Sequence, residues 1–325
     1  MELDFDPKDN VTKLDLLLAI PLNRAIIRFK ELQMVLKYVY NWYSLLLFRV
    51  KIKRSVEVHF RDGYKIKFIS LSDYFKYFDE ILKKPIGMKT INLKIKTDIK
   101  EISITYKNHN LRFSYDNNTL LANTIWMLRE QFLQEQYKNL NVTDRVVIDI
   151  GANIGDTAIY FAVNGAAHVY AFEPYTYSYL HAIKNVILNH LKTKITLLNE
   201  GCGKNNDEIT VDSSYTNIAS SELKKTSLGH RIKIYTLKSI IDKHHINDNA
   251  ILKIDCEGCE YGAILHVNDN VLRKFKHIQG EYHYGYKNIE KKLKDAGFRV
   301  KHTIPTKDLS HGDEGFNGLF YARLL

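Results

Sequence analysis

The stretch from residue 145 to residue 174, RVVIDIGANIGDTAIYFAVNGAAHVYAFEP, constrains the fold of this 325-residue chain more than any other. Its first apolar run, Val146–Ile150, predicts a buried strand, and a glycine-bearing turn and an apolar helical pattern follow it. A second apolar run ends in Glu173 and Pro174. This order predicts a nucleotide-binding βαβ unit, because the glycines let a ligand approach the backbone and the acid can accept ribose hydroxyls.

The turn of this unit departs from the Gly-x-Gly-x-x-Gly fingerprint of dinucleotide-binding proteins. The three positions hold Gly151, Asn153 and Asp156, so two glycines are missing, and an acid in the first helical turn would repel a pyrophosphate. Asp149, just before the turn, would instead suit a cationic group. Together with Glu173, the pattern favours S-adenosylmethionine (SAM), which has an amino acid at one end and adenosine at the other. The remaining alternative is an α/β turn without a ligand.

Strand and helix patterns continue to alternate towards the C-terminus. Apolar strand patterns occupy residues 195–198, 209–212, 232–235, 250–255, 278–283, 298–303 and 319–324, and helical patterns occupy residues 175–190 and 287–296. These units predict an α/β, Rossmann-like domain over residues 119–325, with a mostly parallel sheet and its ligand at the carboxyl ends of the strands. A loop around Gly201 would lie where an adenine base binds, and the polar segment 213–229 is a candidate lid.

Two of the predicted strand ends concentrate ionisable side chains, in the sequences LKIDCEGCE and QGEYH. Asp255 and Glu257 follow one strand, and Glu281 and His283 share a face of the next because side chains alternate along a strand. Methyl transfer to a hydroxyl needs a base or a metal, and His283 is the first candidate base because histidine ordinarily titrates near neutral pH. Alternatively, the four side chains hold a divalent cation, or the two glutamates only brace their loops.

The chain has three cysteines, too few for a disulfide framework. Cys256 and Cys259 have C-x-x-C spacing, but a zinc site would need two further soft ligands, and Cys202 stands alone. We therefore expect both to be small packing residues with reduced thiols, as in a cytoplasmic protein. The acidic start, MELDFD, lacks the positive region of a signal peptide.

Basic side chains are concentrated in the front half of the chain. Residues 1–140 carry 24 basic and 16 acidic side chains, and residues 141–325 carry 23 and 21. A helical region is expected at residues 1–54, but the apolar runs within residues 11–50 are interrupted and shorter than the about 20 residues that span a bilayer. They suit a helix that packs on its own domain or on a second copy; the alternative is an interfacial helix on the inner face of a membrane.

Residues 55–118 change to a period of two, which predicts a small, basic, β-rich module. Val56 and Val58 alternate with polar residues, and Asp62 and Gly63 predict the tight turn of a hairpin. A helix is expected after Ser72, and further strands at residues 91–95, 102–106 and 111–115. The module contains no catalytic spacing, so it is a candidate substrate-recognition region.

The segments IDIGANIGDTAIYFA, AFEP, LKIDCEGCEY and GEYHY together resemble the FkbM family of SAM-dependent methyltransferases, over roughly residues 120–305. The resemblance implies a class I methyltransferase fold, with a mostly parallel seven-stranded sheet, after a small α+β region. It also implies O-methylation of a hydroxyl on a sugar, glycan, lipid or other small metabolite. The expected cofactor contacts are Asp149, Gly151, Asn153, Gly155, Glu173, Gly201 and Asp255.

Two other functions compete with this interpretation. The basic module would suit an RNA or protein methyltransferase, because phosphate contacts dominate affinity for nucleic acids. However, the chain lacks an Asn-Pro-Pro-Tyr element for exocyclic amines and a recognisable aromatic platform for RNA bases, so nucleic acid is disfavoured. A degenerate fold that serves only as a scaffold is disfavoured because the acids at Asp149 and Glu173 are intact.

Overall fold

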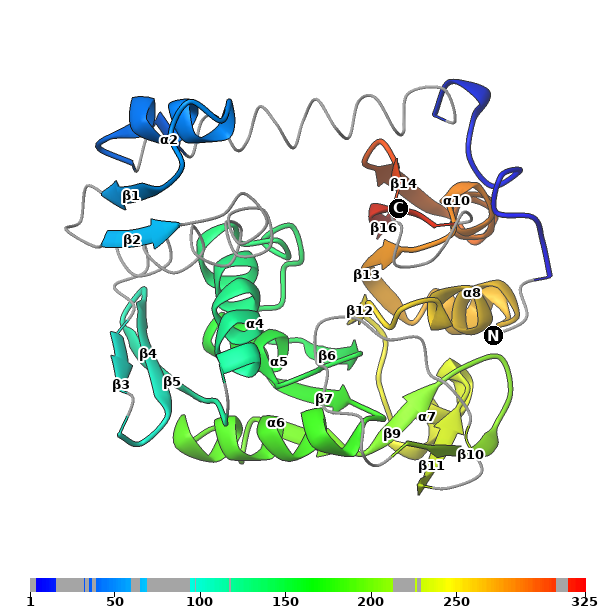
Figure 1. Ribbon diagram of the computed structural model, residues 1–325. Helices are drawn as coiled ribbons and strands as arrows, with labels where there is room; N and C mark the ends of the chain where they lie inside the picture. Colours follow the sequence, from blue (N-terminus) through cyan, green and yellow to red (C-terminus); the bar gives the residue numbers. More distant parts are fainter. Residues whose placement is uncertain are drawn as a thin grey trace. The chain divides into compact units, whose positions relative to one another are not determined.

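The computed structural model describes residues 4–15, 32, 35–36, 39–59, 65–68, 94–96, 98–116, 118–212, 226, 229–307 and 315–325. The chain divides into two compact units (Figure 1). The first unit comprises Met1–Ile20 and Glu135–Leu325, and the second comprises Pro21–Gln134. The division differs from the expected boundary at residues 118 and 119, because the helix that follows this boundary packs within the second unit.

A mostly parallel sheet organises the first unit, with strands in the order β14-β16-β13-β12-β6-β7-β8 (Figure 1). These strands are β6 (Val146–Ile150), β7 (His168–Phe172), β8 (Ile195–Leu198), β12 (Ala250–Ile254), β13 (Phe275–Tyr282), β14 (Phe298–His302) and β16 (Phe316–Leu324). Only β16 runs antiparallel to its neighbours on this path, and the short β15 (Thr306–Lys307) pairs with it. Among the described residues, the expected Rossmann-like sheet is confirmed.

Helices connect these strands and cover the sheet. They are α5 (Asp156–Val163), α6 (Thr176–Leu188), α7 (Leu237–Lys243), α8 (Cys259–Leu265), α9 (Asp269–Leu272) and α10 (Lys287–Asp295). Every residue of β12 is buried, as expected for a central parallel strand that is covered on both faces. One of these buried residues is Lys253, whose charge needs a partner inside the protein.

A smaller sheet of the first unit contains β9 (Glu200–Cys202), β10 (Asp207–Val211) and β11 (His230–Tyr235) in the order β10-β11-β9. The expected loop around Gly201 is therefore wrong: this residue lies in β9 and is paired with Ile234 of β11. The two strands predicted around residues 209–212 and 232–235 are confirmed. Most of the candidate lid, residues 213–229, lies outside the described residues.

The second unit contains two small antiparallel sheets. Its elements are α2 (Trp42–Arg49), β1 (Val56–His59), β2 (Lys65–Phe68), β3 (Lys94–Lys96), β4 (Glu101–Tyr106), β5 (His109–Ser114), α4 (Asn118–Leu128) and the π-helix η1 (Arg129–Leu133). Pairing of Val56 with Phe68 confirms the predicted hairpin strands. Their turn, the helix expected after Ser72 and half of residues 11–50 lie outside the described residues.

Aromatic packing explains why the segment before residue 135 belongs to the second unit. The ring of Phe132 lies 5.1 Å from that of Tyr106 and 5.8 Å from that of Phe113, measured between centroids. All three rings are buried, so α4 and η1 complete a core with β4 and β5.

No helix in the described part of the chain has the length and apolar character needed to cross a bilayer.

Candidate active site

The glycine turn after β6 is packed tightly against the end of β12. Gly151 has a φ angle of 77°, which favours glycine, and a Cβ placed on it would lie 1.8 Å from the carbonyl oxygen of Asp255. Gly155, with a φ angle of 80°, precedes the first residue of α5. The turn therefore brings the predicted cofactor loop and Asp255 to one edge of the sheet, at the carboxyl ends of parallel strands.

Glu173 follows β7 and faces the same turn. One carboxylate oxygen, Oε2, accepts a hydrogen bond from the backbone N–H of Asn153 at 2.9 Å, and Oε1 accepts one from the N–H of Tyr175 at 2.8 Å. The side chain is buried, and burial raises the pKa of Glu173 to about 7 although these two bonds favour the ionised form. The glycine turn after β6 thus orients the carboxylate of Glu173, the acid predicted to bind the ribose.

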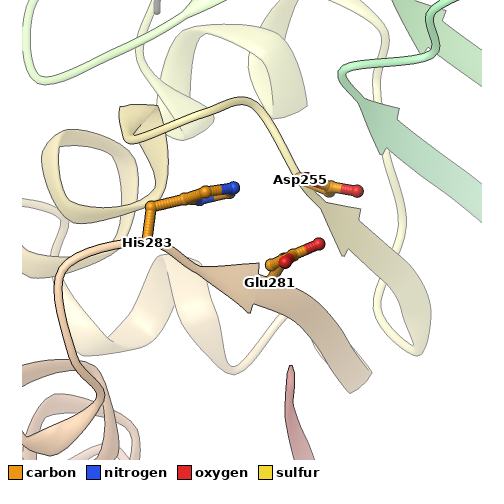
Figure 2. Close-up of side chains that lie close together, drawn as sticks. All are labelled: Asp255, Glu281 and His283. Carbon is orange, nitrogen blue, oxygen red and sulfur yellow. The ribbon is translucent and has the colours of Figure 1, made fainter. Parts of the chain in front are cut away.

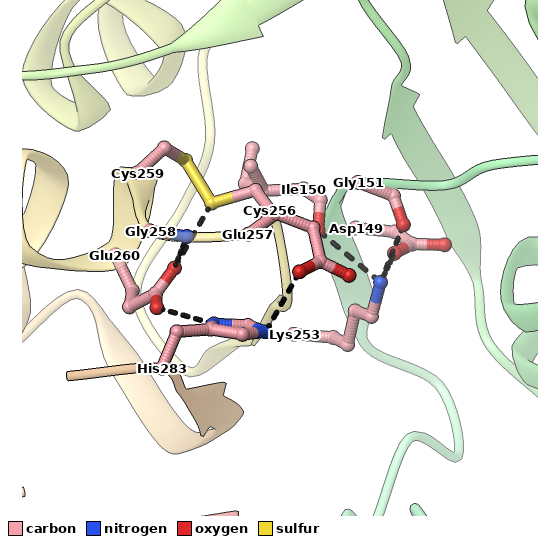
Figure 3. Close-up of a disulfide and its surroundings, with 10 residues drawn as sticks. All are labelled: Asp149, Ile150, Gly151, Lys253, Cys256, Glu257, Gly258, Cys259, Glu260 and His283. Atoms are coloured by element: carbon pink, nitrogen blue, oxygen red, sulfur yellow. Dashed lines mark hydrogen bonds and ion pairs between the residues drawn. A yellow bond between two sulfur atoms is a disulfide. The ribbon is translucent and has the colours of Figure 1, made fainter. Parts of the chain in front are cut away.

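Asp149 is completely buried beneath the turn, where it pairs with a lysine (Figure 3). Its Oδ2 accepts a hydrogen bond from the hydroxyl of Thr157 at 2.6 Å, and its Oδ1 lies 3.1 Å from Nζ of Lys253. The same Nζ donates to the carbonyl oxygens of Gly151 at 2.6 Å and Ile150 at 3.2 Å. Asp149 was expected to suit a cationic group, and in this structure that group is Lys253.

Lys253 is not among the site residues expected from the sequence, although its position in an apolar strand could have indicated it. A lysine in the middle of an apolar strand must find a buried partner, and the register of β6 and β12 places it directly beside Asp149. Burial by itself would lower the pKa of Lys253. The charges of Asp149 and Asp255 raise this pKa by more than burial lowers it, so the net shift is upwards and the ammonium group stays charged.

The surroundings of this lysine are strongly acidic. Asp156 opens α5, is buried, and has its pKa raised to about 7 by burial, with Lys253 acting against that shift. The charge of Asp149 contributes to the raised pKa values of both Asp156 and Glu173. Such a donor set fits a cationic ligand with ribose hydroxyls, as SAM is, and does not fit a pyrophosphate.

Asp255, Glu281 and His283 converge at the ends of β12 and β13 (Figure 2). One potential ligand atom from each lies within 4.8 Å of the others. The hydroxyl of Tyr137 donates to Oδ2 of Asp255 at 3.5 Å. Two carboxylates and a neutral imidazole could hold a divalent cation, and without a cation the two carboxylates could accept a proton.

His283 is buried between two glutamates (Figure 3). Its Nδ1 lies 2.7 Å from Oε1 of Glu260, and its Nε2 lies 3.3 Å from Oε2 of Glu257. Burial lowers the pKa of His283, but Glu260, Glu257 and Glu281 together raise it well above the ordinary value. The three carboxylates therefore favour the protonated imidazole, which cannot accept another proton.

Glu260 is a further site residue that was not expected from the sequence. It is completely buried, and its Oε2 accepts a hydrogen bond from the backbone N–H of Gly258 at 3.0 Å while Oε1 contacts His283. A buried carboxylate needs such partners, so Glu260 holds the orientation of the imidazole. The available signal was a second glutamate three residues after Glu257, at the start of the helix that follows the strand.

Cys256 and Cys259 form a disulfide, so the expectation of two reduced packing thiols is wrong (Figure 3). The backbone between them turns sharply, with φ angles of 57° at Glu257 and 112° at Gly258. This turn brings the two Cα atoms to 5.5 Å, a separation that a disulfide can bridge. Cys202, by contrast, is a free and buried cysteine.

Gly201 lies beside the residue that follows Glu173. A Cβ placed on Gly201 would lie 3.6 Å from Cβ of Pro174 and 2.6 Å from Cδ1 of Ile234. The structure thus brings together the expected cofactor residues at the ends of β6, β7 and β12, with Gly201 next to them on β9. Which of these residues touch the cofactor stays a prediction.

Comparisons with known proteins match one part of the chain to a known domain. Residues 149–300 match the family profile of the methyltransferase FkbM domain, and no curated protein matches the chain. Among solved structures, the chain is similar to a Streptococcus mutans protein classed as a SAM-dependent methyltransferase, with 11% identity and a TM-score of 0.41, covering 69% of this chain and only 56% of that one.

Two further structures are comparably similar. Methyltransferase FkbM from Methylobacillus flagellatus has 13% identity and a TM-score of 0.38, covering 77% of this chain and 60% of that one. The SAM-dependent methyltransferase from Agrobacterium tumefaciens has 8% identity and a TM-score of 0.39, covering 69% and 70%. Because these scores are low, the assignment depends on the family profile. The chain therefore matches the methyltransferase FkbM domain over residues 149–300, somewhat less than half of its length.

Proposed function

We propose that this chain is an O-methyltransferase whose acceptor is a hydroxyl on a sugar, glycan, lipid or other small metabolite. The observation that carries the proposal is the convergence of Asp255, Glu281 and His283 at two adjacent strand ends. This cluster lies beside the turn that begins at Gly151, because that glycine packs against the backbone of Asp255. A cofactor loop and a proton-accepting cluster are thus neighbours on one edge of the sheet.

The turn and Glu173 would hold SAM, which supplies a methyl group on a positively charged sulfur. The Glu173 carboxylate retains lone pairs for ribose hydroxyls after accepting its two backbone hydrogen bonds. Lys253 fixes the carbonyl of Gly151 and so keeps the turn in place. The buried acids Asp149 and Asp156 add negative potential that favours a cation.

The carboxylates of Asp255 and Glu281 are the proposed acceptors of the hydroxyl proton, because both are partly exposed while His283 is buried. The neighbouring glutamates raise the pKa of His283 and so favour its protonated form, which would position the carboxylates instead of accepting a proton. A carboxylate base therefore replaces His283, the base expected from the sequence. A divalent cation on the same three side chains is the alternative, and it would acidify the hydroxyl directly.

The acceptor is tested with SAM that carries a deuterated methyl group. The full chain is incubated with extracts of sugars, glycans and lipids, and products that gain the label are identified by mass spectrometry. The proposal predicts label on oxygen. Label on nitrogen, on RNA or on protein would contradict it, and repetition with a chelator distinguishes the carboxylate base from the metal.

Conservative variants test the assigned roles. Glu281→Gln is expected to lower the transfer rate by about 10²–10⁴-fold, the usual contribution of a general base, and to leave SAM affinity unchanged. Glu290→Gln, on helix α10 and outside the cluster, is the matched control and should retain full activity. Glu281→Gln with undiminished turnover would remove this carboxylate from the mechanism.

A further inference from the structure

The disulfide between Cys256 and Cys259 closes a loop at the centre of the proposed transfer site (Figure 3). The loop begins directly after Asp255 and leads into α8. Only two residues separate the cysteines, and both adopt positive φ angles: 57° at Glu257 and 112° at Gly258. Positive φ is unfavourable for a glutamate, so this conformation persists only where the surroundings enforce it.

The two residues inside the loop hold the imidazole of His283 from both sides. Glu257 contacts Nε2 directly at 3.3 Å, and the backbone N–H of Gly258 donates to Glu260, whose other oxygen contacts Nδ1 at 2.7 Å. A change in the loop backbone would move both contacts together. The disulfide therefore acts on His283 through the loop and not through direct contact.

The two bonded cysteines are less buried than the third cysteine. Cys256 and Cys259 are partly exposed residues, whereas Cys202 is buried. Glu173 and its contact with Asn153, which belong to the proposed cofactor site, lie on other elements. Opening the disulfide would thus act first on the contacts of His283, and it would reach the cofactor turn only through Asp255, against which Gly151 packs.

We propose that Cys256 and Cys259 form a reversible thiol–disulfide site at which a dithiol reductant slows methyl transfer. The effect on transfer rests on the proposed function, whereas the redox reaction itself does not. A thiolate of the reductant attacks one protein sulfur, and the S–S bond breaks to give a mixed disulfide and a protein thiolate. The second reductant thiolate then attacks the mixed disulfide. Two electrons and two protons pass to the protein, which becomes a dithiol, and the reductant becomes a disulfide.

The redox reaction is tested on the full chain by trapping its thiols. The protein is equilibrated with dithiothreitol up to about 10 mM under native conditions, denatured, alkylated and weighed by mass spectrometry. Cys202 is the internal reference, because the oxidised chain carries one free thiol and the reduced chain three. The proposal predicts conversion from one label to three and back on oxidation. A single label throughout, as for a permanent structural disulfide, or three labels before reduction would overturn it.

The consequence for the site is measured in the oxidised and reduced forms side by side. Reduction is expected to increase hydrogen exchange in residues 255–261, to leave SAM affinity within about twofold, and to slow transfer by about tenfold or more, since small misplacements of catalytic groups have large effects. A Cys256→Ser/Cys259→Ser variant should behave as the reduced form under all conditions, and Cys202→Ala should retain the response. Equal exchange and equal rates in both forms would overturn the switch. Absence of transfer in both forms, with the exchange difference present, would count against the proposed function alone.

Discussion

The ion pair between Lys253 and Asp149 is the most deeply buried charged contact among the described residues, with exposed side-chain fractions of 1% and 0%. A buried pair contributes little over an apolar pair of the same shape, but the loss of one partner leaves an uncompensated charge. Lys253 also holds the carbonyl oxygens of Ile150 and Gly151. Its role therefore combines stability with the position of the cofactor turn.

Lys253→Met is expected to lower the free energy of unfolding by about 3–5 kcal/mol, because Asp149 is left buried and unpaired. The double variant Lys253→Met/Asp149→Asn should be less destabilised than the single one. Lys238→Met, which breaks an ion pair exposed by 63% and 60%, is the control and should change stability by less than about 1 kcal/mol. Urea unfolding measures all three, and equal losses for Lys253→Met and Lys238→Met would contradict the assigned role.

Glu173 gives SAM binding a predictable pH dependence. Burial raises the pKa of this carboxyl to about 7, so it is mostly neutral at pH 6 and mostly ionised at pH 8. A cationic ligand favours the ionised form, and affinity should therefore fall by about tenfold as the pH drops from 8 to 6. Calorimetric titration with SAM at each pH measures this change.

Glu173→Gln is the matched variant for this titration. It should flatten the pH dependence and weaken binding at pH 8 by about 1.5–3 kcal/mol, the value of a hydrogen bond to a charged group. Asp156 also has a pKa raised to about 7, so a residual slope in the variant is expected from that carboxyl. An affinity of the wild-type chain that is constant from pH 6 to pH 8 would exclude an ionised Glu173 as a SAM contact.

At the scale of elements, the turn between β6 and α5 depends on close approach of the backbone to the end of β12. Gly151→Ala should destabilise the first unit by about 1–3 kcal/mol from its positive φ, with a further loss because Cβ would meet the carbonyl oxygen of Asp255. Gly165→Ala separates the two effects: Gly165 has a φ angle of 95°, but the nearest atom to its Cβ would be 3.7 Å away.

Thermal unfolding and SAM affinity of the two glycine variants provide the measurement. Only Gly151→Ala is expected to weaken SAM binding, because only that turn borders the proposed cofactor site. Equal stability losses in both variants would show that the contact with Asp255 has no effect of its own.

The strands around the site were largely predictable, because a buried parallel strand is a short apolar run bounded by turn residues. The ends of β6, β7, β12 and β13 follow the expected pattern, and so does the convergence of Asp255, Glu281 and His283. The strand at Gly201 was missed, since its three residues are too few to show a period of two. Pairing with β11, not local sequence, makes it a strand.

At the scale of the whole molecule, the proposed SAM contacts lie in the first unit. A ligand that binds only the folded state stabilises it by about 2.7 kcal/mol when present at a hundredfold excess over its Kd. SAM should therefore protect the first unit from hydrogen exchange and leave the strands β4 and β5 of the second unchanged. Equal protection of both units would show that the cofactor site is not confined to the first.

The sequence by itself determined the βαβ unit, the alternation of strands and helices, and the acids at the ends of β6, β7 and β12. These features are local, because they depend on apolar periodicity and on residues at strand ends. The family resemblance depends on the same local segments, and it was confirmed over residues 149–300. The fold class therefore follows from local sequence alone, and SAM as the donor is a prediction from the same segments.

Only the tertiary structure decided which charges are paired. The partner of Lys253 lies 104 residues away in Asp149, and that of His283 lies 23 residues away in Glu260. Periodicity assigns a side chain to a face of an element but does not say which distant element packs there, and buried charges take their pKa from that packing. The Cys256–Cys259 disulfide depended likewise on a backbone turn with positive φ, which residue spacing alone does not specify.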